Sequence, residues 1–186
     1  MDYIAYFDNV LEEEICDKII SKFEHETKQQ EHTILENHRS FNEINITKNE
    51  GWVDIQNILL EKMQTYLGVY MKYFGVDEMS WPKQTGYEEF RIKKYMPNDF
   101  DEFKFHVDVQ DYATARRFLV FFFYLNTVKE GGETAFQKNK QSELELKVKP
   151  TKGRLLMFPP LWTHPHVALK PISEPKYIIG SYLHYI

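Results

Sequence analysis

Residues 118–125 read FLVFFFYL, the longest uninterrupted apolar stretch of this 186-residue chain. An apolar run of this length suits a β-strand that is buried on both faces, because a half-buried strand alternates polar and apolar side chains. The run leads into a turn at residues 130–133, which read EGGE. It therefore predicts a central strand in a mainly β fold.

The segments on either side of this strand also have strand patterns. Downstream, residues 144–148 (LELKV) alternate as a half-buried strand does, and residues 154–158 (RLLMF) and 176–185 (KYIIGSYLHY) read as two more. Upstream, residues 87–95 and 103–108 read as extended pieces separated by a turn. We expect six to eight strands, arranged as a sandwich or jelly roll.

The first part of the chain is predicted to be helical. Asn9 followed by Glu12 resembles a capping box that begins a helix. A longer helix is expected over residues 53–74, with Gly75 as its C-cap. Residues 26–50 are polar and weakly patterned, which predicts a loop with short strands.

We expect one domain over residues 1–186, with helical support in residues 1–80 and a β core in residues 87–185. A hydrophobic share of 42% and a charged share of 27% fit a soluble globular protein. The formal net charge of -5 argues against a nucleic-acid partner, because neutralising phosphates needs a surplus of Lys and Arg. The start of the chain lacks signal-peptide features, and no apolar run approaches the roughly 20 residues of a membrane helix. We therefore expect a cytoplasmic protein with no membrane partner.

Two small groups of basic residues allow more than one interpretation. Arg91, Lys93 and Lys94 lie close together in the sequence, as do Arg116 and Arg117. Each group reads either as a solvated strand edge or as a local basic patch. A further alternative is that Arg116 or Arg117 reaches into a site to contact a ligand.

His106 and Asp108 lie two residues apart in an extended segment, so their side chains are expected on one face. An imidazole beside a carboxylate suits a divalent transition metal, although such a pair alone is weak evidence. His164 and His166, about 60 residues downstream, offer a third ligand. Two histidines and one carboxylate form a facial triad that leaves metal positions open for co-substrates. Lys176 on the following strand offers a positive charge for an anionic co-substrate.

The order of these residues resembles the 2-oxoglutarate/Fe(II) oxygenase superfamily, and within it the prolyl 4-hydroxylase-like branch. The resemblance covers about residues 87–185 and rests on these motifs: Tyr95, His106-Val107-Asp108, Tyr124-Leu125-Asn126, residues 131–136 (GGETAF), residues 153–159 (GRLLMFP), His166 and Lys176-Tyr177. It implies a double-stranded β-helix, a jelly-roll or cupin-like fold with two helices packed on one sheet. It also implies Fe(II), 2-oxoglutarate and O2 as cofactors, with ascorbate as a supporting reductant.

The resemblance implies three metal ligands that are also the catalytic residues: His106, Asp108 and His166. It further implies that Lys176 holds the distal carboxylate of 2-oxoglutarate and that Tyr95 donates a hydrogen bond to the same end. In this family the charged residue follows the distal histidine by ten positions, which selects His166 over His164. A carboxylate ligand at Asp108 implies hydroxylation, because related halogenases leave that position open for halide.

The implied reaction is hydroxylation of a peptidyl or free amino-acid side chain, with proline as the best single choice, so we expect a peptide or small-molecule substrate. Two alternatives stay open: oxidation of a nucleobase or another small molecule, and a non-catalytic sensor module that binds metal or 2-oxoglutarate. The acidic net charge disfavours a nucleic-acid substrate, and Lys176 disfavours a pure metal binder. Tyr182 stands where many relatives have tryptophan, which leaves the substrate undecided.

Overall fold

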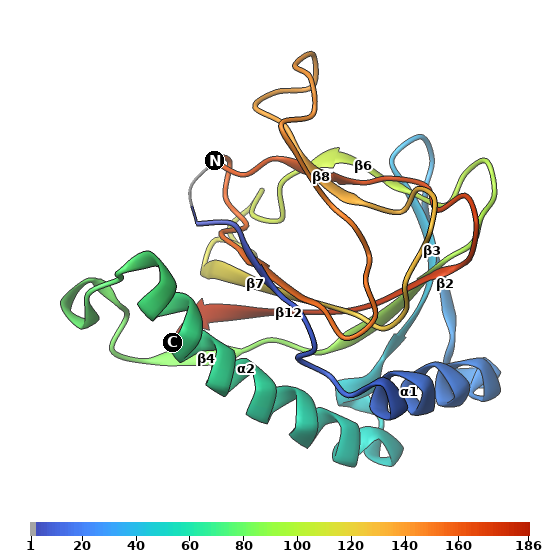
Figure 1. The fold of residues 1–186 in the computed structure, drawn as a ribbon, viewed down its shortest axis with the longest axis horizontal. Helices are drawn as coiled ribbons and strands as arrows, with labels where there is room; N and C mark the ends of the chain where they lie inside the picture. The colour runs from blue at the N-terminus through green and yellow to red at the C-terminus, as the bar shows by residue number, and fades with distance from the viewer. Residues whose placement is uncertain (1–2) are drawn as a thin grey trace.

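The computed structural model describes residues 3–186 and consists of a strongly curved antiparallel sheet with helices on one outer face (Figure 1). The strands over these residues are β1 (Ala5–Phe7), β2 (Glu31–Leu35), β3 (Arg39–Asn45), β4 (Thr85–Tyr87), β5 (Arg91–Tyr95), β6 (Phe103–His106), β7 (Arg117–Tyr124), β8 (Thr134–Phe136), β9 (Leu146–Val148), β10 (Leu155–Phe158), β11 (His166–Ala168) and β12 (Lys176–Tyr185). The helices are α1 (Glu13–His25), α2 (Val53–Phe74) and four short 3-10 turns, Thr27–Gln29, Ile46–Lys48, Glu50–Trp52 and Glu78–Ser80.

The strands pair in the order β1-β10-β7-β12-β5-β3-β6-β11-β8-β9, with β2 added to β3 and β4 added to β12. The sheet curls so that β6 and β8 lie on the far side of the molecule from the helices, facing the wall formed by β7 and β12 (Figure 1). This nearly closed antiparallel architecture confirms the expected mainly β, double-stranded β-helix class.

The strand at residues 118–125 is confirmed as β7, and its two faces belong to two different cores. Leu119, Phe121 and Phe123 pack in the core under the helices. Val120 and Tyr124 are buried in a second core inside the curved sheet. Because side chains alternate along a strand, burial on both faces requires an uninterrupted apolar run.

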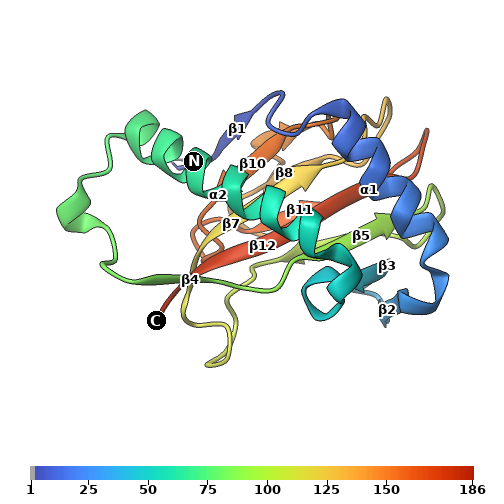
Figure 2. The same cartoon turned by 90° about the horizontal axis from the view of Figure 1, so that it is seen from below.

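The two long helices cover the outer face of the sheet (Figure 2). Helix α2 has the expected bounds and buries Ile55, Leu59 and Met63, and Gly75 ends it in the left-handed conformation with φ of 62°. No helix in the part of the chain described here is long and apolar enough to cross a bilayer.

The expected capping box at Asn9 is wrong. Helix α1 begins at Glu13 and has no side-chain cap, and Asn9 has a φ of 56°. The backbone N–H groups of Val10 and Leu11 donate to the carbonyl of Gly153, at 2.8 and 3.2 Å. This segment therefore ties the chain to the turn before β10 instead of starting the helix.

The expected number and order of strands are also wrong in part. Strand β1 precedes the helices, and the short strands expected within residues 26–50 form the β2–β3 hairpin, so residues 3–186 hold twelve strands. Strand β3 pairs with both β5 and β6. Its apolar pattern is weak because Arg39 and Glu43 line an open cleft, whereas Phe41 between them is buried in the inner core.

Candidate metal centre

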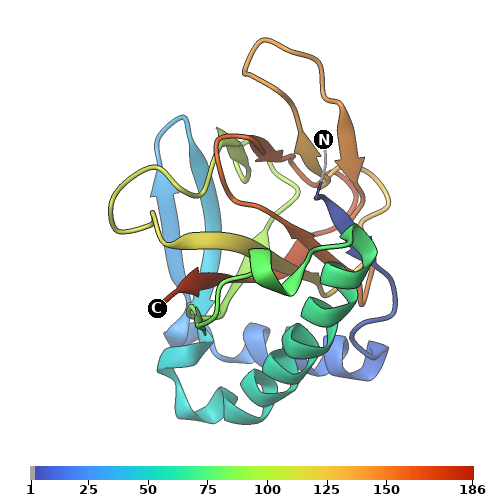
Figure 3. The same ribbon diagram turned by 90° about the vertical axis from the view of Figure 1, so that its left-hand side faces the viewer.

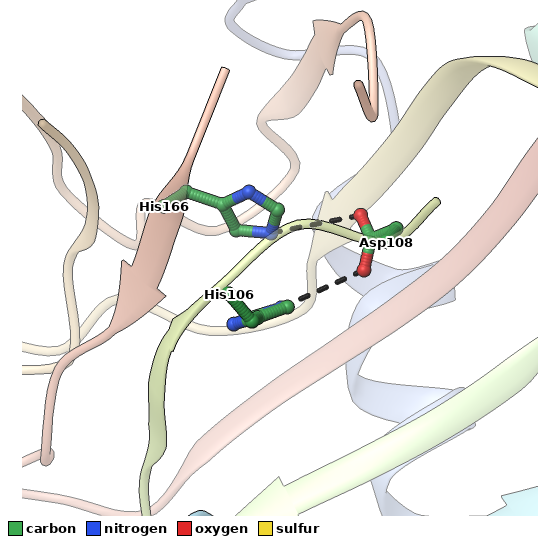
Figure 4. Close-up of side chains that lie close together, drawn as sticks. All are labelled: His106, Asp108 and His166. Carbon is green, nitrogen blue, oxygen red and sulfur yellow. Dashed lines mark ion pairs between the residues drawn. The ribbon is translucent and has the colours of Figure 1, made fainter. Parts of the chain in front are cut away.

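Strand pairing brings His106 and His166 together. They are direct partners in the antiparallel pair of β6 and β11. Asp108 lies just beyond the end of β6, and its backbone N–H donates to the carbonyl of Pro160 at 3.2 Å. The sequence had suggested that strand alternation puts Asp108 on the same face as His106, and this expectation is wrong because Asp108 lies beyond the strand. The bend after His106 turns the Asp108 carboxylate toward both imidazoles (Figure 4).

The three side chains have the geometry of a metal site. His106 Nε2 lies 3.5 Å from Asp108 Oδ1, and His166 Nε2 lies 3.6 Å from Asp108 Oδ2. The potential ligand atoms all lie within 4.8 Å of one another. Nδ1 of His106 and of His166 donates to a backbone carbonyl two residues earlier, at 2.6 and 3.1 Å. These bonds fix the rings and leave each Nε2 free as a ligand.

The protonation states also suit a cation. Burial opposes ionisation of Asp108, but His166 and His106 lower the pKa of its carboxyl to about 2. Burial, together with His106, lowers the pKa of His166 to about 4. A neutral imidazole and an ionised carboxylate are the forms that bind metal.

Two buried atoms of this cluster, Asp108 Oδ2 and His166 Nε2, have no hydrogen-bond partner among the described residues. Buried polar atoms without partners are rare and call for a missing ligand or ion. A divalent cation between the three side chains would satisfy both atoms. Two histidines and one carboxylate with open positions are the donor set of non-haem Fe(II), so the residues fit that ion.

The structure separates the two candidate histidines of residues 164–166. The side chain of His164 contacts the Thr163 hydroxyl through Nδ1 at 2.8 Å, and it does not belong to the group of potential ligands. Its backbone carbonyl accepts from His166 Nδ1. His166 therefore belongs to the group of potential ligands, and its role as a metal ligand stays a prediction.

A narrow inner cavity adjoins the cluster and contains Lys176 and Tyr95, which are direct partners in the β12–β5 pair. Lys176 is 1% exposed, and its Nζ donates to the Gly132 carbonyl at 2.9 Å. Nζ also lies 4.7 Å from the centroid of the Tyr95 ring. Burial lowers the pKa of Lys176 to about 7, although Glu133 acts in the opposite direction.

Lys176 has no ion-pair partner within residues 3–186. A buried ammonium without a counter-charge is costly, and a carboxylate bound in the cavity would remove that cost. Phe122, Ile178 and Ala168 make much of the remaining wall apolar. The cavity thus suits a small molecule with an anionic end at Lys176 and a metal-binding end at the cluster.

An outer cleft of about 500 Å³ opens on the other side of the cluster. The β2–β3 hairpin and the segment between β6 and β7 lie at this end of the molecule (Figure 3). Arg117 lines the cleft, so of the alternatives for Arg116 and Arg117 the structure shows that Arg117 reaches the site. Its Nη2 lies 2.7 Å from Glu88 Oε2, and its Nη1 donates to the backbone carbonyl of Asp108 at 3.3 Å.

Tyr182 shares this wall, with the Arg117 guanidinium 4.1 Å from its ring centroid. Burial and the Asp108 carboxylate raise the pKa of Tyr182 well above its usual value, so its hydroxyl stays protonated beside Asp108. The sequence had marked Tyr182 only as a departure from tryptophan. Its position six residues after Lys176, on the same face of β12, would have placed it near the site.

Sequence reasoning missed three other residues of the cleft: Arg39, Lys93 and Phe103. The Phe103 ring stacks on His106 with 3.5 Å between ring centroids. Lys93 was interpreted as a residue of a solvated strand edge or basic patch, but it is half-buried and lines both cavities. The signal was its position two residues before Tyr95, which places both on one face of β5. Arg39 lies in the hairpin that the sequence suggested was mostly loop.

Comparisons with known proteins agree with this geometry. A family model described as the 2OG-Fe(II) oxygenase superfamily matches residues 90–184, which include every residue of the metal cluster and inner cavity named above. No curated protein matches the chain.

Several solved structures share the fold. A viral collagen prolyl hydroxylase from Paramecium bursaria Chlorella virus-1, solved with 2-oxoglutarate, is 19% identical, with a TM-score of 0.69 over 100% of this chain and 97% of the other. A prolyl hydroxylase from Trichoplax adhaerens, in complex with a peptide fragment of hypoxia inducible factor, is 16% identical, with a TM-score of 0.77 over 99% and 84%. A prolyl-4-hydroxylase from Pseudomonas putida is 13% identical, with a TM-score of 0.69 over 98% and 92%. At these identities the likeness concerns the fold.

Proposed function

The chain belongs to the 2OG-Fe(II) oxygenase superfamily, and on that premise we propose that it hydroxylates a peptidyl or free amino-acid side chain, with proline as the first candidate. Membership makes it a dioxygenase that uses Fe(II), 2-oxoglutarate and O2. One observation carries the proposal: a buried cluster of two histidines and a carboxylate adjoins a cavity that contains a buried lysine with no ion-pair partner within residues 3–186.

In this proposal His106, Asp108 and His166 hold the iron. Bound Fe(II) and 2-oxoglutarate supply the oxidative chemistry, in which one oxygen atom of O2 enters a C–H bond of the substrate while 2-oxoglutarate becomes succinate and carbon dioxide. The protein's part is to fix the ligands, and the hydrogen bonds from each histidine Nδ1 to a backbone carbonyl do so. Asp108 fills the third protein position, which favours hydroxylation over halogenation.

The inner cavity would orient the co-substrate. Lys176 would hold its distal carboxylate, and the bond to the Gly132 carbonyl aims the ammonium. The Tyr95 hydroxyl, which forms no hydrogen bond within residues 3–186, would donate to the same carboxylate. Burial raises the pKa of Tyr95 above its usual value, so the hydroxyl keeps its proton for this bond. The apolar wall around Ile178 would exclude water from the reacting end.

The choice of an amino-acid side chain rests on the outer cleft and on the structural neighbours. The neighbours described above are prolyl hydroxylases, and one was solved with a peptide. The cleft has a volume of about 500 Å³, and its lining includes His106 and Asp108 of the metal cluster. Both points support a peptide or amino-acid substrate.

The test is turnover with labelled 2-oxoglutarate in the presence of Fe(II) and ascorbate. We expect succinate formation that rises when a proline-containing peptide is added, together with a peptide product heavier by one oxygen atom. The same peptide with proline replaced by alanine is the control. Absence of succinate from properly metallated protein, with or without peptide, would contradict the proposal. If only nucleobases increase succinate formation, the substrate is a nucleobase and not an amino-acid side chain.

A further inference from the structure

Two cationic side chains line the outer cleft beside the metal cluster and form no ion pair or hydrogen bond within residues 3–186, and we propose that they bind a carboxylate of the acceptor substrate. They are Arg39 on β3 and Lys93 on β5. The inference rests on the proposed function and narrows its substrate to an amino acid or peptide that carries a negative charge close to the oxidised carbon.

Lys93 lies at the junction of the two cavities and lines both. Its Nζ lies 4.8 Å from the ring centroid of Phe41 and 6.0 Å from that of Phe103. Glu43 is its direct partner in the β3–β5 pair, yet that carboxylate accepts from the Thr33 hydroxyl at 2.7 Å. The Lys93 side chain forms no hydrogen bond or ion pair within the described residues 3–186.

Arg39 lies next to Phe103 in the sheet, because the two residues are direct partners in the β3–β6 pair. Its guanidinium carbon is 5.5 Å from the centroid of the Phe103 ring. Its Nε is buried and has no hydrogen-bond partner among the described residues. Because the Phe103 ring also stacks on His106, both cations lie close to the metal cluster, and the Asp108 carboxylate acts on Lys93 directly.

The remaining charges of the cleft already have partners, apart from the proposed metal ligands. Arg91 lies 2.7 Å from Glu89 and 3.6 Å from Glu43, Arg117 lies 2.7 Å from Glu88, and Asp111 accepts from the Thr114 hydroxyl at 2.8 Å. Arg39 and Lys93 are therefore a local surplus of positive charge at the point where a substrate would approach the iron. A cleft of this kind favours a bound anion.

The anion belongs to the acceptor substrate because the co-substrate has its own cation. Lys176 lies in the inner cavity, whereas Arg39 lines only the outer cleft. Burial lowers the pKa of Lys93, so an adjacent carboxylate would also offset the cost of keeping that ammonium charged. Two cations on one carboxylate would position the substrate from one side while its reacting carbon faces the metal.

The experiment measures binding without turnover. The protein is loaded with Mn(II) in place of Fe(II) and with N-oxalylglycine, an inert analogue of 2-oxoglutarate, and the paramagnetic relaxation of probe protons is followed by NMR. The first pair of probes is N-acetyl-L-proline and its uncharged amide. The second pair is a blocked Glu-Pro-Glu peptide and the matching Gln-Pro-Gln peptide. The pairs distinguish a terminal carboxylate from an acidic side chain.

We expect the charged member of at least one pair to bind roughly tenfold more tightly than its uncharged partner. Lys93→Met should remove that difference, because it keeps the length of the side chain but not the charge. Lys94→Met is the matched control. Lys94 is the next residue of β5, but it points away from the cleft and pairs with Glu24 of α1 at 2.8 Å.

Equal binding of charged and uncharged probes in both pairs would overturn the inference with no variant needed. A tenfold preference that survives in Lys93→Met and in Arg39→Met would also overturn it. If Lys93→Met weakens N-oxalylglycine and leaves the probes unchanged, Lys93 serves the co-substrate and the inference is wrong. Failure of the wild-type protein to bind Mn(II) and N-oxalylglycine would overturn the proposed function itself, and the inference with it.

Discussion

Lys176 is 1% exposed and has no carboxylate partner within residues 3–186, so in the protein without co-substrate water does not solvate its charged form, and burial lowers its pKa to about 7. Replacing a buried cation by an apolar side chain of similar length often leaves a protein as stable or more stable. Charge-assisted hydrogen bonds contribute about 1.5–3 kcal/mol. The residue therefore serves binding at the expense of stability.

Lys176→Met should weaken 2-oxoglutarate binding about ten- to a hundredfold, because the charge-assisted bond to the distal carboxylate is lost. The unfolding free energy of the ligand-free protein should stay the same or rise. Calorimetric titration of metal-loaded protein and urea unfolding measure the two quantities. Unchanged affinity in this variant would show that the carboxylate binds elsewhere.

The affinity for 2-oxoglutarate should depend on pH through the same residue. The groups that face Lys176 are Glu133, Lys93 and Tyr95, and burial lowers its pKa to about 7 in the free protein. A bound carboxylate raises that pKa, so affinity is full below about pH 7 and falls as the pH rises above it. Calorimetry in buffers of different ionisation enthalpy should detect proton uptake on binding at pH 8. Constant affinity between pH 6 and 9 would contradict this assignment.

Single residues of the site were predictable where a motif fixed them and not where tertiary pairing did. The grouping of His106, Asp108 and Lys176 was expected from the family resemblance, although the bend after β6 and not strand spacing places Asp108. Arg39 was not expected there, because its role depends on a strand pairing that brings it beside Phe103. Nothing in the local sequence around Arg39 records that contact.

At the level of elements, the turn before β10 depends on a glycine. Gly153 has a φ of +76°, and a Cβ there would lie 2.5 Å from the backbone oxygen of Leu11. Its carbonyl also accepts the N–H of Val10. The turn therefore joins the end of the first segment to the strands that carry the site.

Gly153→Ala should lower the free energy of unfolding by roughly 2–4 kcal/mol, the sum of backbone strain and a close contact that the turn cannot relieve. Gly75→Ala is the matched control, because Gly75 has a similar φ of +62° but no atom within 4 Å of the added Cβ. It should cost only the backbone strain, about 1–2 kcal/mol. Urea unfolding of both proteins measures the difference, and equal losses would contradict the packing argument.

Helices and strands with a strong apolar pattern were predictable from the sequence. The hairpin whose residues line the cleft was not. Helix α2 and strand β7 have long apolar patterns that match their burial. The β2–β3 hairpin has exposed apolar residues such as Ile34 and polar ones facing the cleft. Alternation of apolar and polar residues detects a strand that packs one face on an apolar core. It does not detect this hairpin, because one of its faces lines a cavity.

In the whole molecule the sheet lies between the helices and the metal cluster. The helices pack on its outer face, and the metal cluster and both cavities lie inside the curve. The proposed ligands come from β6, the bend after it and β11, while Lys176 comes from β12. Metal and co-substrate together would therefore connect the two walls.

Fe(II) with 2-oxoglutarate should raise the melting temperature of the whole protein, since ligands that bind only the native state stabilise it by about 2.7 kcal/mol at a hundred times Kd. A chelator should reverse the gain. Anaerobic differential scanning calorimetry measures it, with Lys176→Met as the control that keeps the metal effect and loses most of the 2-oxoglutarate effect. A melting temperature that does not respond to either ligand would contradict a site between the walls.

The most direct measurement is an anaerobic absorption titration with Fe(II) and 2-oxoglutarate, which follows the visible charge-transfer band of a 2-oxo acid chelated to Fe(II). The wild-type protein should develop this band with saturation at one equivalent of iron, and His164→Ala should behave in the same way. His106→Ala and His166→Ala should lose the band at iron concentrations that saturate the wild type. A full band in His166→Ala, or its loss in His164→Ala, would contradict the metal centre described for this fold.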